Sequence, residues 1–302
     1  MQQRKLISFD FAIKKLLRSK ANFEILEGFL SELLFEDITI LEILESASNK
    51  ESKIDKSNIL DIKVKNNNNE IIIIEVQYSS ELDYLQRIAY ATSKTITEHM
   101  KEGDSYSNIH KVISVSILYF DFGDGDDYIY KGNTSFIGLH NKTKLKLNEK
   151  QQELYKVKQV EDIYPEHYLI KVKNFNNNSK DTLDEWIHFL KNEEIANKPK
   201  AKGLLKAKEK LDYLKMSQEE KEQYEHYKEN KHHEASIYES TYVVGEIMGI
   251  KKGIKRGIEQ GIEQGEKQKA IEVARNCIKQ GLDIETIRNI TGLSDEEIKD
   301  IS

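Results

Sequence analysis

Residues 59–77 read ILDIKVKNNNNEIIIIEVQ, and this stretch predicts two β-strands joined by a tight turn. The first strand, 59–64, alternates polar and apolar side chains from residue 61 on. The residues 66–69 are all asparagine, a turn-forming type, and they separate it from the second strand, 70–76. Four successive isoleucines give the second strand apolar side chains on both faces, as expected of a central strand covered on both sides.

The length of the turn determines which residues of the two strands face each other. If the loop consists of the three residues 67–69, Asp61 lies directly opposite Glu75. Directly paired residues of neighbouring strands have Cβ atoms about 4.5–5.5 Å apart. Gln77 follows Glu75 by two residues and therefore points to the same face. A slip of one residue would turn Asp61 to the other face and remove the arrangement.

Two carboxylates at that distance predict a cation site. Asp61 and Glu75 would repel each other unless a positive ion lies between them. Because carboxylate oxygens and water are the donors, the expected ion is Mg²⁺ or Mn²⁺. Two alternatives involve no metal: Asp61 is a charge on an edge strand, or Glu75 forms an ion pair with Lys63. Against them, a carboxylate directly after the four isoleucines is costly to bury without a partner.

The segments around this hairpin predict a mixed α/β fold. Apolar residues recur at three- and four-residue intervals from Ser8 to Phe35 and again from Leu82 to Met100, which indicates a helix on either side. β-branched or leucine-rich runs predict further strands at 39–44, 112–120, 128–139 and 168–172. A helix, three strands, a helix and further strands is the pattern of a sheet flanked by helices.

From about residue 181 the sequence becomes helical and highly charged, so we expect a core at 1–180, a charged helical region at 181–240 and a third region at 241–302. In the third region a glycine recurs every four residues from Gly245 to Gly265, and an isoleucine directly follows four of them. Glycine costs a helix about 1 kcal/mol relative to alanine, which close packing against another helix can offset. The repeat therefore predicts either a homodimer through this helix or a flexible linker.

The last residues of the chain resemble a helix-turn-helix. One helix is predicted from Asp283, followed by a turn at 291–293 and a second helix capped by Ser294, with Glu297 completing a capping box. A helix that reads DNA bases presents Arg, Lys, Asn or Gln to them. The second helix reads SDEEIKD and would repel phosphate, so a structural or dimer-forming role is favoured over DNA reading.

Composition restricts the class of protein. The net charge of −6 counts against constitutive high-affinity DNA binding, yet it permits a nuclease because a metal site itself needs carboxylates. No run of about 18 apolar residues occurs, so we expect no membrane span, and the N-terminus lacks the features of a secretory signal. The single cysteine, Cys277, excludes intramolecular disulfides. These features predict a cytoplasmic protein.

The hairpin motif also carries a family resemblance. Leu60-Asp61-Ile62-Lys63 followed by Ile74-Glu75-Val76-Gln77 resembles the PD-(D/E)XK nuclease superfamily, in the Rpn branch of recombination-promoting nucleases or putative transposases. Asp10-Phe11-Ala12-Ile13-Lys14, the helix that follows the hairpin, and the glycine-repeat tail are similar to that branch as well. The resemblance implies a restriction-endonuclease-like core, a mixed sheet flanked by helices, with a helical C-terminal extension.

The resemblance also implies roles for single residues. Asp61, Glu75 and Gln77 are the expected catalytic residues, and the two carboxylates are the expected metal ligands. Gln77 stands in the place of the superfamily's lysine; a neutral amide can orient water but supplies no positive charge. Lys63 and Arg87 are expected to contact the substrate phosphate. For Arg87 the alternative is an ion pair on the surface of its own helix, with Asp83 or Glu98.

The function implied by the resemblance is that of a Mg²⁺- or Mn²⁺-dependent DNA endonuclease linked to recombination or mobile elements. In such an enzyme the metal polarises the phosphoryl oxygen and generates hydroxide from bound water. Two alternatives stay open. One is a catalytically weak relative that acts as a binding or oligomeric partner, and the other is a transposase that joins strands.

Overall fold

A computed structural model describes residues 6–12, 20–44 and 61–301 of the chain. These residues form two compact units, one up to Lys231 and one from His232 on. Each unit has its own cluster of buried apolar side chains. Part of the first predicted helix (13–19) and the start of the first hairpin strand (59 and 60) lie outside the described residues.

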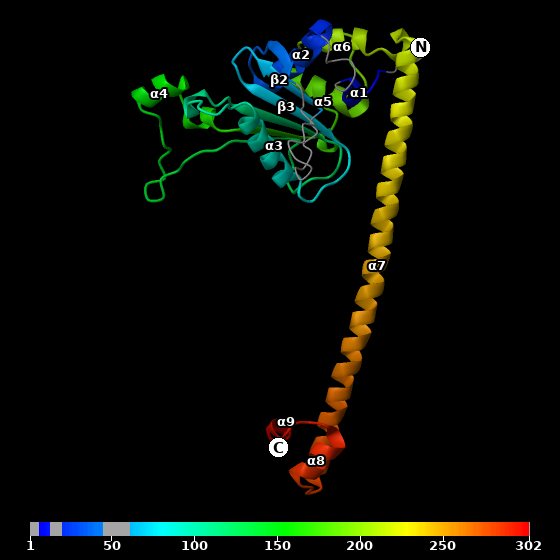
Figure 1. Cartoon of the computed structure of the whole chain (residues 1–302). Helices are drawn as coiled ribbons and strands as arrows, with labels where there is room; N and C mark the ends of the chain where they lie inside the picture. Colours follow the sequence, from blue (N-terminus) through cyan, green and yellow to red (C-terminus); the bar gives the residue numbers. More distant parts are fainter. Residues whose placement is uncertain (1–5, 13–19, 45–60, 302) are drawn as a thin grey trace. The chain divides into compact units, whose positions relative to one another are not determined.

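The first unit is built on one mixed sheet (Figure 1). Its strands are β1 (Ile40–Leu44), β2 (Ile62–Asn66), β3 (Ile71–Gln77), β4 (Val112–Leu118), β5 (Ile129–Gly132) and β6 (Glu166–Lys171). In space the order is β1-β2-β3-β4-β6-β5. Pairing is antiparallel from β1 to β3, parallel from β3 through β4 to β6, and antiparallel between β6 and β5. The predicted mixed α/β class is therefore confirmed.

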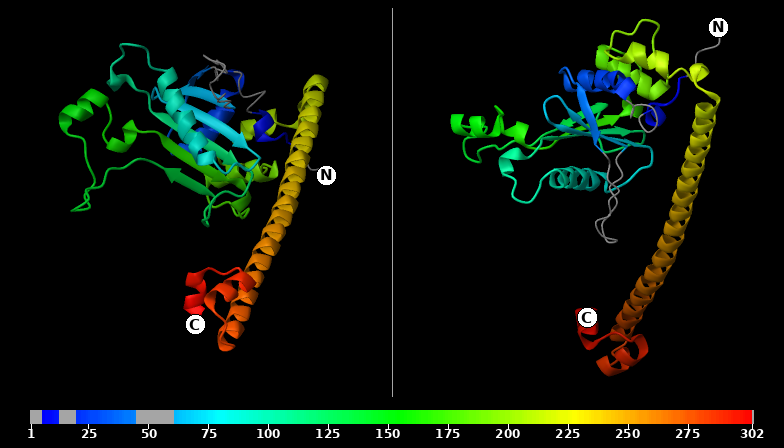
Figure 2. Two further views of the ribbon diagram at one scale, coloured as in Figure 1. Left: turned by 60° about the horizontal axis from the view of Figure 1, so that its bottom comes forward. Right: turned by 45° about the horizontal axis from the view of Figure 1, so that its top comes forward.

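One face of the sheet carries the main hydrophobic core. Ile72, Ile74 and Val76 of β3 are buried in it, together with apolar side chains of β2, β4 and β6. Because strand side chains alternate, these three residues are the set opposite to Glu75 and Gln77. Helices α1 (Phe9–Phe11), α2 (Phe23–Leu34), α5 (Thr182–Asn192) and α6 (Leu204–Lys210) contribute to this core, and Figure 2 shows them gathered on the same side of the sheet.

Helices α5 and α6 pack directly on α2. Trp186 of α5 is fully buried and lies edge-on to Phe9 and Phe29, with ring centroids 5.9 and 5.6 Å away. Gly28 lets α2 approach the chain before α6 closely, because a Cβ at position 28 would lie 2.3 Å from the carbonyl oxygen of Lys202. The packing of the first unit therefore includes α5 and α6.

Helix α3 (Tyr84–Glu98) covers the opposite face of the sheet (Figure 2). Ala91 packs against Ile71 and Ile73 of β3, and Tyr84 at the start of the helix packs against Leu118 of β4. Strand β3 is therefore covered on both faces, as its run of isoleucines predicted. This side of the sheet is also the side to which Glu75 points.

The strand predicted at 128–139 is shorter than expected. Only β5 pairs regularly, and beyond it a single bridge joins Ile137 to Lys144. The apolar residues that suggested a longer strand, such as Phe136 and Leu139, are exposed. Gly132 pairs with His167, the second residue of β6, so the chain after Gly132 runs past the start of that strand.

The polar segment 218–233 is helical and forms the start of α7 (Gln218–Lys279). Most of its side chains are polar, yet Tyr224 is buried. The Tyr224 ring lies edge-on to Phe11 at 5.0 Å, and its hydroxyl accepts a hydrogen bond from the backbone N–H of Ser8 at 3.2 Å. One turn of α7 thus packs in the first unit through aromatic contacts, although most residues of the segment are polar.

Short elements complete the first unit. They are α4 (Glu149–Tyr155) and the 3₁₀ helices η2 (Lys20–Asn22), η3 (Tyr106–Asn108), η4 (Val160–Ile163), η5 (Val172–Asn174) and η6 (Tyr213–Lys215). Among the described residues, no helix is both long enough and apolar enough to cross a membrane.

The second unit ends in the predicted helix-turn-helix. Helices α8 (Ile284–Thr291) and α9 (Asp295–Ile301) pack with the end of α7 around Ala274, Ile287, Leu293 and Ile298. Asp283 caps α8, Gly292 ends it in the left-handed conformation at φ +70°, and Ser294 and Glu297 form the predicted capping box. Each cap agrees with the local rule from which it was predicted.

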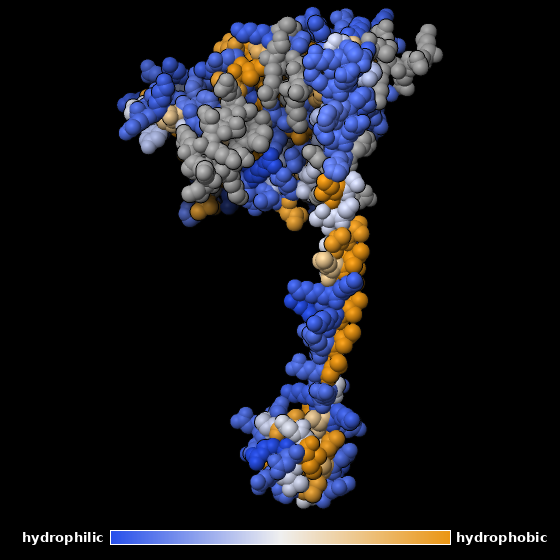
Figure 3. All heavy atoms as spheres, turned by 45° about the vertical axis from the view of Figure 1, so that its right-hand side comes forward, coloured by the Kyte–Doolittle hydropathy of each residue, from blue (hydrophilic) through white to orange (hydrophobic). Residues whose placement is uncertain are grey.

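The glycine repeat lies in the middle of α7 and is helical, not a flexible linker. Ile250, Ile254, Ile258 and Ile262 are each more than half exposed, and they contribute to the apolar stripe along the helix in Figure 3. No described atom lies within 4 Å of a Cβ built on any glycine from 245 to 265, apart from the immediate chain neighbours and the helix backbone. The repeat is therefore an apolar surface of the second unit.

Candidate active site

The turn between β2 and β3 has the length that places the two carboxylates together. Ile62 pairs with Ile74 and Lys65 with Ile71, so the loop consists of residues 67–69. The backbone N–H of Asn66 donates to the Glu70 carbonyl oxygen at 3.0 Å and closes the loop. Asn69 takes the left-handed conformation at φ +64°, which asparagine tolerates. The predicted register of β2 and β3 is confirmed, and Asp61, the residue just before β2, lies close enough to Glu75 for its charge to act on that carboxyl.

Asp61 is fastened to the strand that carries Glu75. Its Oδ2 accepts a hydrogen bond from the backbone N–H of Val76 at 2.6 Å. A carboxylate oxygen that accepts from a backbone N–H is held in one orientation. The Asp61 carboxylate is therefore held against the backbone of β3, next to Glu75.

Glu75 is a buried carboxylate with two protein partners. It is only 7% exposed, Arg87 of α3 donates to its Oε1, and the Tyr84 hydroxyl donates to its Oε2 at 3.3 Å. Burial raises the pKa of Glu75 to about 7; Arg87 opposes the rise, and the nearby charge of Asp61 adds to it. Burial raises the pKa of Tyr84 too, so its hydroxyl stays protonated and remains a donor.

Gln77 lies at the end of β3 and belongs to the same network. Its Nε2 donates to the Ser79 carbonyl oxygen at 3.2 Å and to Glu81 Oε1 at 2.9 Å. Arg87 Nη1 lies 2.7 Å from the same Glu81 oxygen. Arg87 thus joins Glu75 to Glu81, and three of the five predicted site residues, Glu75, Gln77 and Arg87, lie in one network on the α3 side of the sheet. Asp61, the fourth, is bonded to the backbone of Val76.

Lys63 is the predicted residue that lies apart from this network. It points to the same face as Asp61 but is buried, and its Nζ lies 3.1 Å from Glu98 Oε2 near the end of α3. The cation that contacts Glu75 is Arg87, and the partners of Arg87 are Glu75 and Glu81. The contact of Lys63 with a substrate phosphate stays a prediction.

Sequence reasoning missed Glu81 and Tyr84. Tyr84 is three residues before Arg87, so a helix starting near residue 84 puts both on one face, and this spacing was a usable signal. Glu81 lies between β3 and α3, where no periodicity applies, and only the course of the chain brings it to Gln77. Its position had no signal in the sequence.

The donor set at Asp61 and Glu75 fits a hard divalent cation. Among the described residues, no group of three or more His, Cys, Asp and Glu side chains is arranged to hold a metal. Mg²⁺, however, is usually held by one or two carboxylates and completes its shell with water and substrate phosphate. Two carboxylates facing each other, one of them buried and with its pKa raised toward neutrality, match that pattern of ligands.

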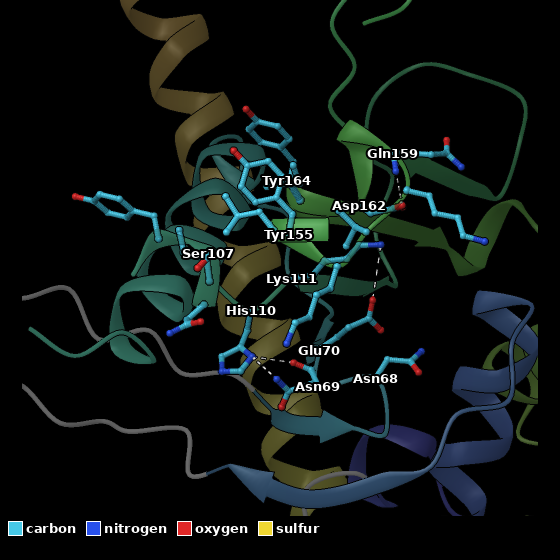
Figure 4. Close-up of a pocket in the computed structure, with 18 of the residues that line it drawn as sticks. Asn68, Asn69, Glu70, Ser107, His110, Lys111, Tyr155, Gln159, Asp162 and Tyr164 are labelled. Atoms are coloured by element: carbon cyan, nitrogen blue, oxygen red, sulfur yellow. Dashed lines mark hydrogen bonds and ion pairs between the residues drawn. The ribbon is translucent and has the colours of Figure 1, made fainter. Parts of the chain in front are cut away.

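A separate hollow lies at the opposite end of the sheet (Figure 4). This cavity of about 1280 Å³ is lined by the β2–β3 turn, by residues 106–111 and by residues 154–164. His110 Nδ1 lies 2.9 Å from the Asn69 carbonyl oxygen at its wall. None of the predicted site residues lines it, so the cavity and the carboxylate pair are distinct features of the first unit.

The raised pKa of Glu75 leads to a testable pH dependence of stability. The native carboxyl keeps its proton up to about pH 7, whereas the unfolded chain releases it near its ordinary value of about 4.3. Between these values the native state binds more protons, so the free energy of unfolding falls as pH rises. Without metal, the free energy of unfolding of Glu75→Gln minus that of wild type should therefore rise between pH 4.5 and 7, by about 3 kcal/mol at most.

Urea unfolding in the presence of a chelator at pH 4.5, 5.5, 6.5 and 8 measures this difference. Burial also raises the pKa of Glu36, but Glu36 is present in both proteins and cancels in the comparison. A difference between the two proteins that stays constant across the series would contradict the assignment of the shift to Glu75.

Comparison with protein families yields two matches. The profile of a family described as PD-(D/E)XK nuclease family transposase matches residues 7–241. A second profile, described as the C-terminal HTH domain of the Rpn/YhgA-like nuclease family, matches residues 267–302. No curated protein and no solved structure matches the chain.

Proposed function

The chain belongs to the PD-(D/E)XK nuclease family transposases, with an Rpn-type HTH match at its end, and we propose that it is a divalent-metal-dependent DNA endonuclease. The family prediction made from the hairpin motif is confirmed. The observation that carries the proposal is the register of β2 and β3, which sets Asp61 against the buried Glu75 on the α3 side of the sheet. We place the protein in the cytoplasm, where DNA is accessible.

In this proposal each residue of the network has a part in phosphodiester hydrolysis. Asp61 and Glu75 would hold Mg²⁺ or Mn²⁺, and the bound ion would polarise the phosphoryl oxygen and make water a stronger nucleophile. Gln77 would orient the attacking water. Arg87, whose side chain is one-third exposed, would contact the substrate phosphate if a cation replaced it at Glu75. Lys63 supplies positive charge from deeper on the same face.

Plasmid cleavage tests the proposal directly. The purified protein should convert supercoiled plasmid to nicked or linear DNA with Mg²⁺ or Mn²⁺, and excess chelator should stop the reaction. If no metal condition yields cleavage, the catalytically weak alternative holds, in which the protein acts as a binding or oligomeric partner. The transposase alternative, which the matched family description names, requires joined strands among the products. We link the activity to recombination or mobile elements on the same family grounds.

We also propose that the chain forms a homodimer through the glycine repeat of α7. Four exposed isoleucines at four-residue spacing lie beside glycines that let a second helix come close. The flanking charges support a second copy as the partner, because residues 251–256 are basic and residues 259–266 are acidic. Two antiparallel copies place each basic segment beside the acidic segment of the other.

Adding charge to the isoleucine row should break the dimer. The double variant Ile258→Lys/Ile262→Lys puts two ammonium groups into the proposed contact, and light scattering should report the mass of one chain in place of two. Gln260→Lys/Gln264→Lys is the matched control, since two residues rotate a helix by about 200° and place the same charges on the far side. A wild-type protein of single-chain mass would contradict the proposal.

A further inference from the structure

We propose that Gln77 acts through its carbonyl oxygen Oε1, as an oxygen donor to the bound cation, and that Glu81 is the positioning residue that sets this orientation. The inference rests on the proposed function, because it concerns the same site. The family resemblance places Gln77 where the superfamily has a lysine. In this inference Gln77 does not take over the positive charge of that lysine but contributes an acceptor oxygen.

The hydrogen bonds of Gln77 determine which way its amide faces. A side-chain amide has two N–H donors on nitrogen and one carbonyl acceptor. Nε2 has two acceptors within reach, the Ser79 carbonyl oxygen at 3.2 Å and Glu81 Oε1 at 2.9 Å. The flipped amide would place its own oxygen against these two oxygens, which is repulsive, so the network requires the orientation present in the structure.

Both donors of Gln77 are therefore engaged, and the group that stays available is Oε1. Among the described residues, no side chain or backbone N–H donates to it. Gln77 shares the strand face of Glu75, two residues away. A neutral oxygen beside two carboxylates is the kind of donor that hard divalent cations and their bound waters accept.

Glu81 is itself held in place. Its Oε1 accepts from both Gln77 Nε2 and Arg87 Nη1, at 2.9 and 2.7 Å. Arg87 in turn contacts Glu75. The Glu81–Gln77 hydrogen bond does not itself involve the contact between Arg87 and Glu75, so the amide would keep its orientation if a cation replaced Arg87 at Glu75.

This arrangement predicts an unusual pattern of Mn²⁺ affinity. Glu81→Ala removes the acceptor that orients the amide and should weaken Mn²⁺ binding about 10-fold, as loss of an orienting partner of a metal ligand does. In a Gln77→Glu background, Glu81→Ala should lower the Mn²⁺ affinity by less than about twofold. A carboxylate has two equivalent oxygens, so it needs no partner to orient it. Gln77→Lys, which removes the oxygen, should weaken binding at least as much as Glu81→Ala.

Isothermal titration calorimetry with MnCl₂ on the full-length chain measures these affinities without relying on activity. Asp83→Ala is the matched control, since Asp83 is an exposed carboxylate two residues from Glu81 whose side chain makes no cap hydrogen bond. Its affinity should equal that of wild type. Thermal unfolding of each variant checks that it is folded.

The outcomes separate this inference from the proposed function. Equal losses from Glu81→Ala in both backgrounds, or unchanged binding in Gln77→Lys, would overturn the role of Oε1 while leaving the carboxylate site intact. Loss of Mn²⁺ binding in Asp61→Ala together with unchanged binding in Gln77→Lys would likewise overturn the role of Oε1 and leave the carboxylate site intact. A wild-type protein that binds no Mn²⁺ would overturn both.

Discussion

Replacing Asp61 or Glu75 by alanine is expected to lower the rate of metal-dependent DNA nicking by at least about 1,000-fold, or roughly 4 kcal/mol of transition-state stabilisation. In the proposed site each carboxylate is one of two acidic ligands, and Mg²⁺ binds weakly through a single carboxylate. The loss should be similar for both variants, because the proposal has the two residues hold the same ion. Initial rates of supercoiled plasmid loss at saturating Mg²⁺ measure it.

Folding controls make this result interpretable. Asp61→Asn and Glu75→Gln keep the shape of each side chain and should be equally inactive while remaining folded. Glu42→Ala removes an exposed carboxylate from β1 of the same sheet and should cleave at the wild-type rate. If either alanine variant retained more than about a tenth of the wild-type rate while Glu42→Ala matched wild type, the metal site would lie elsewhere.

Trp186→Ala is expected to cost about 3–5 kcal/mol of unfolding free energy, the largest stability effect anticipated for a single side chain. The indole is fully buried between Phe9, Phe29 and Phe189. Its Nε1 also donates to the Lys202 carbonyl oxygen at 3.1 Å. Alanine would leave a large cavity and one buried carbonyl without its donor. Urea unfolding of the full-length chain measures the change.

Two comparisons test whether α5 is part of the first unit. Tyr106→Ala removes an aromatic ring that is 84% exposed and should change stability by less than about 0.5 kcal/mol. A chain that ends at residue 180 lacks Trp186 and Phe189 altogether, so it should not fold cooperatively. A truncated chain as stable as the full chain would contradict the packing of α5 on α2, and would support the predicted core at 1–180.

The hairpin was predictable because its signals are local. Four asparagines mark the turn, four isoleucines mark a strand buried on both sides, and a three-residue loop determines that Asp61 faces Glu75. The caps of α8 and α9 were predictable for the same reason, since each involves residues three positions apart. Where a few neighbouring residues determine a structure, the sequence alone is sufficient.

The partners of the site residues were not predictable, because they depend on where α3 packs. Arg87 contacts Glu75, and Lys63 contacts Glu98, across 12 and 35 residues of sequence. The choice between these pairs is made by packing of α3 across β3 and β4, which no spacing in the sequence specifies. The burial of Tyr224 in α7 also depends on packing that the sequence does not specify, since this ring is buried in an otherwise polar segment.

The most direct test of the central claim is anomalous scattering from a crystal soaked in MnCl₂. We predict a manganese peak about 2–2.5 Å from carboxylate oxygens of both Asp61 and Glu75, with Arg87 displaced from Glu75. We also predict that Gln77 keeps its Nε2 on Glu81 in that crystal. A map without manganese between the two carboxylates, with Arg87 still bound to Glu75, would contradict the claim that this hairpin is a metal-binding nuclease site.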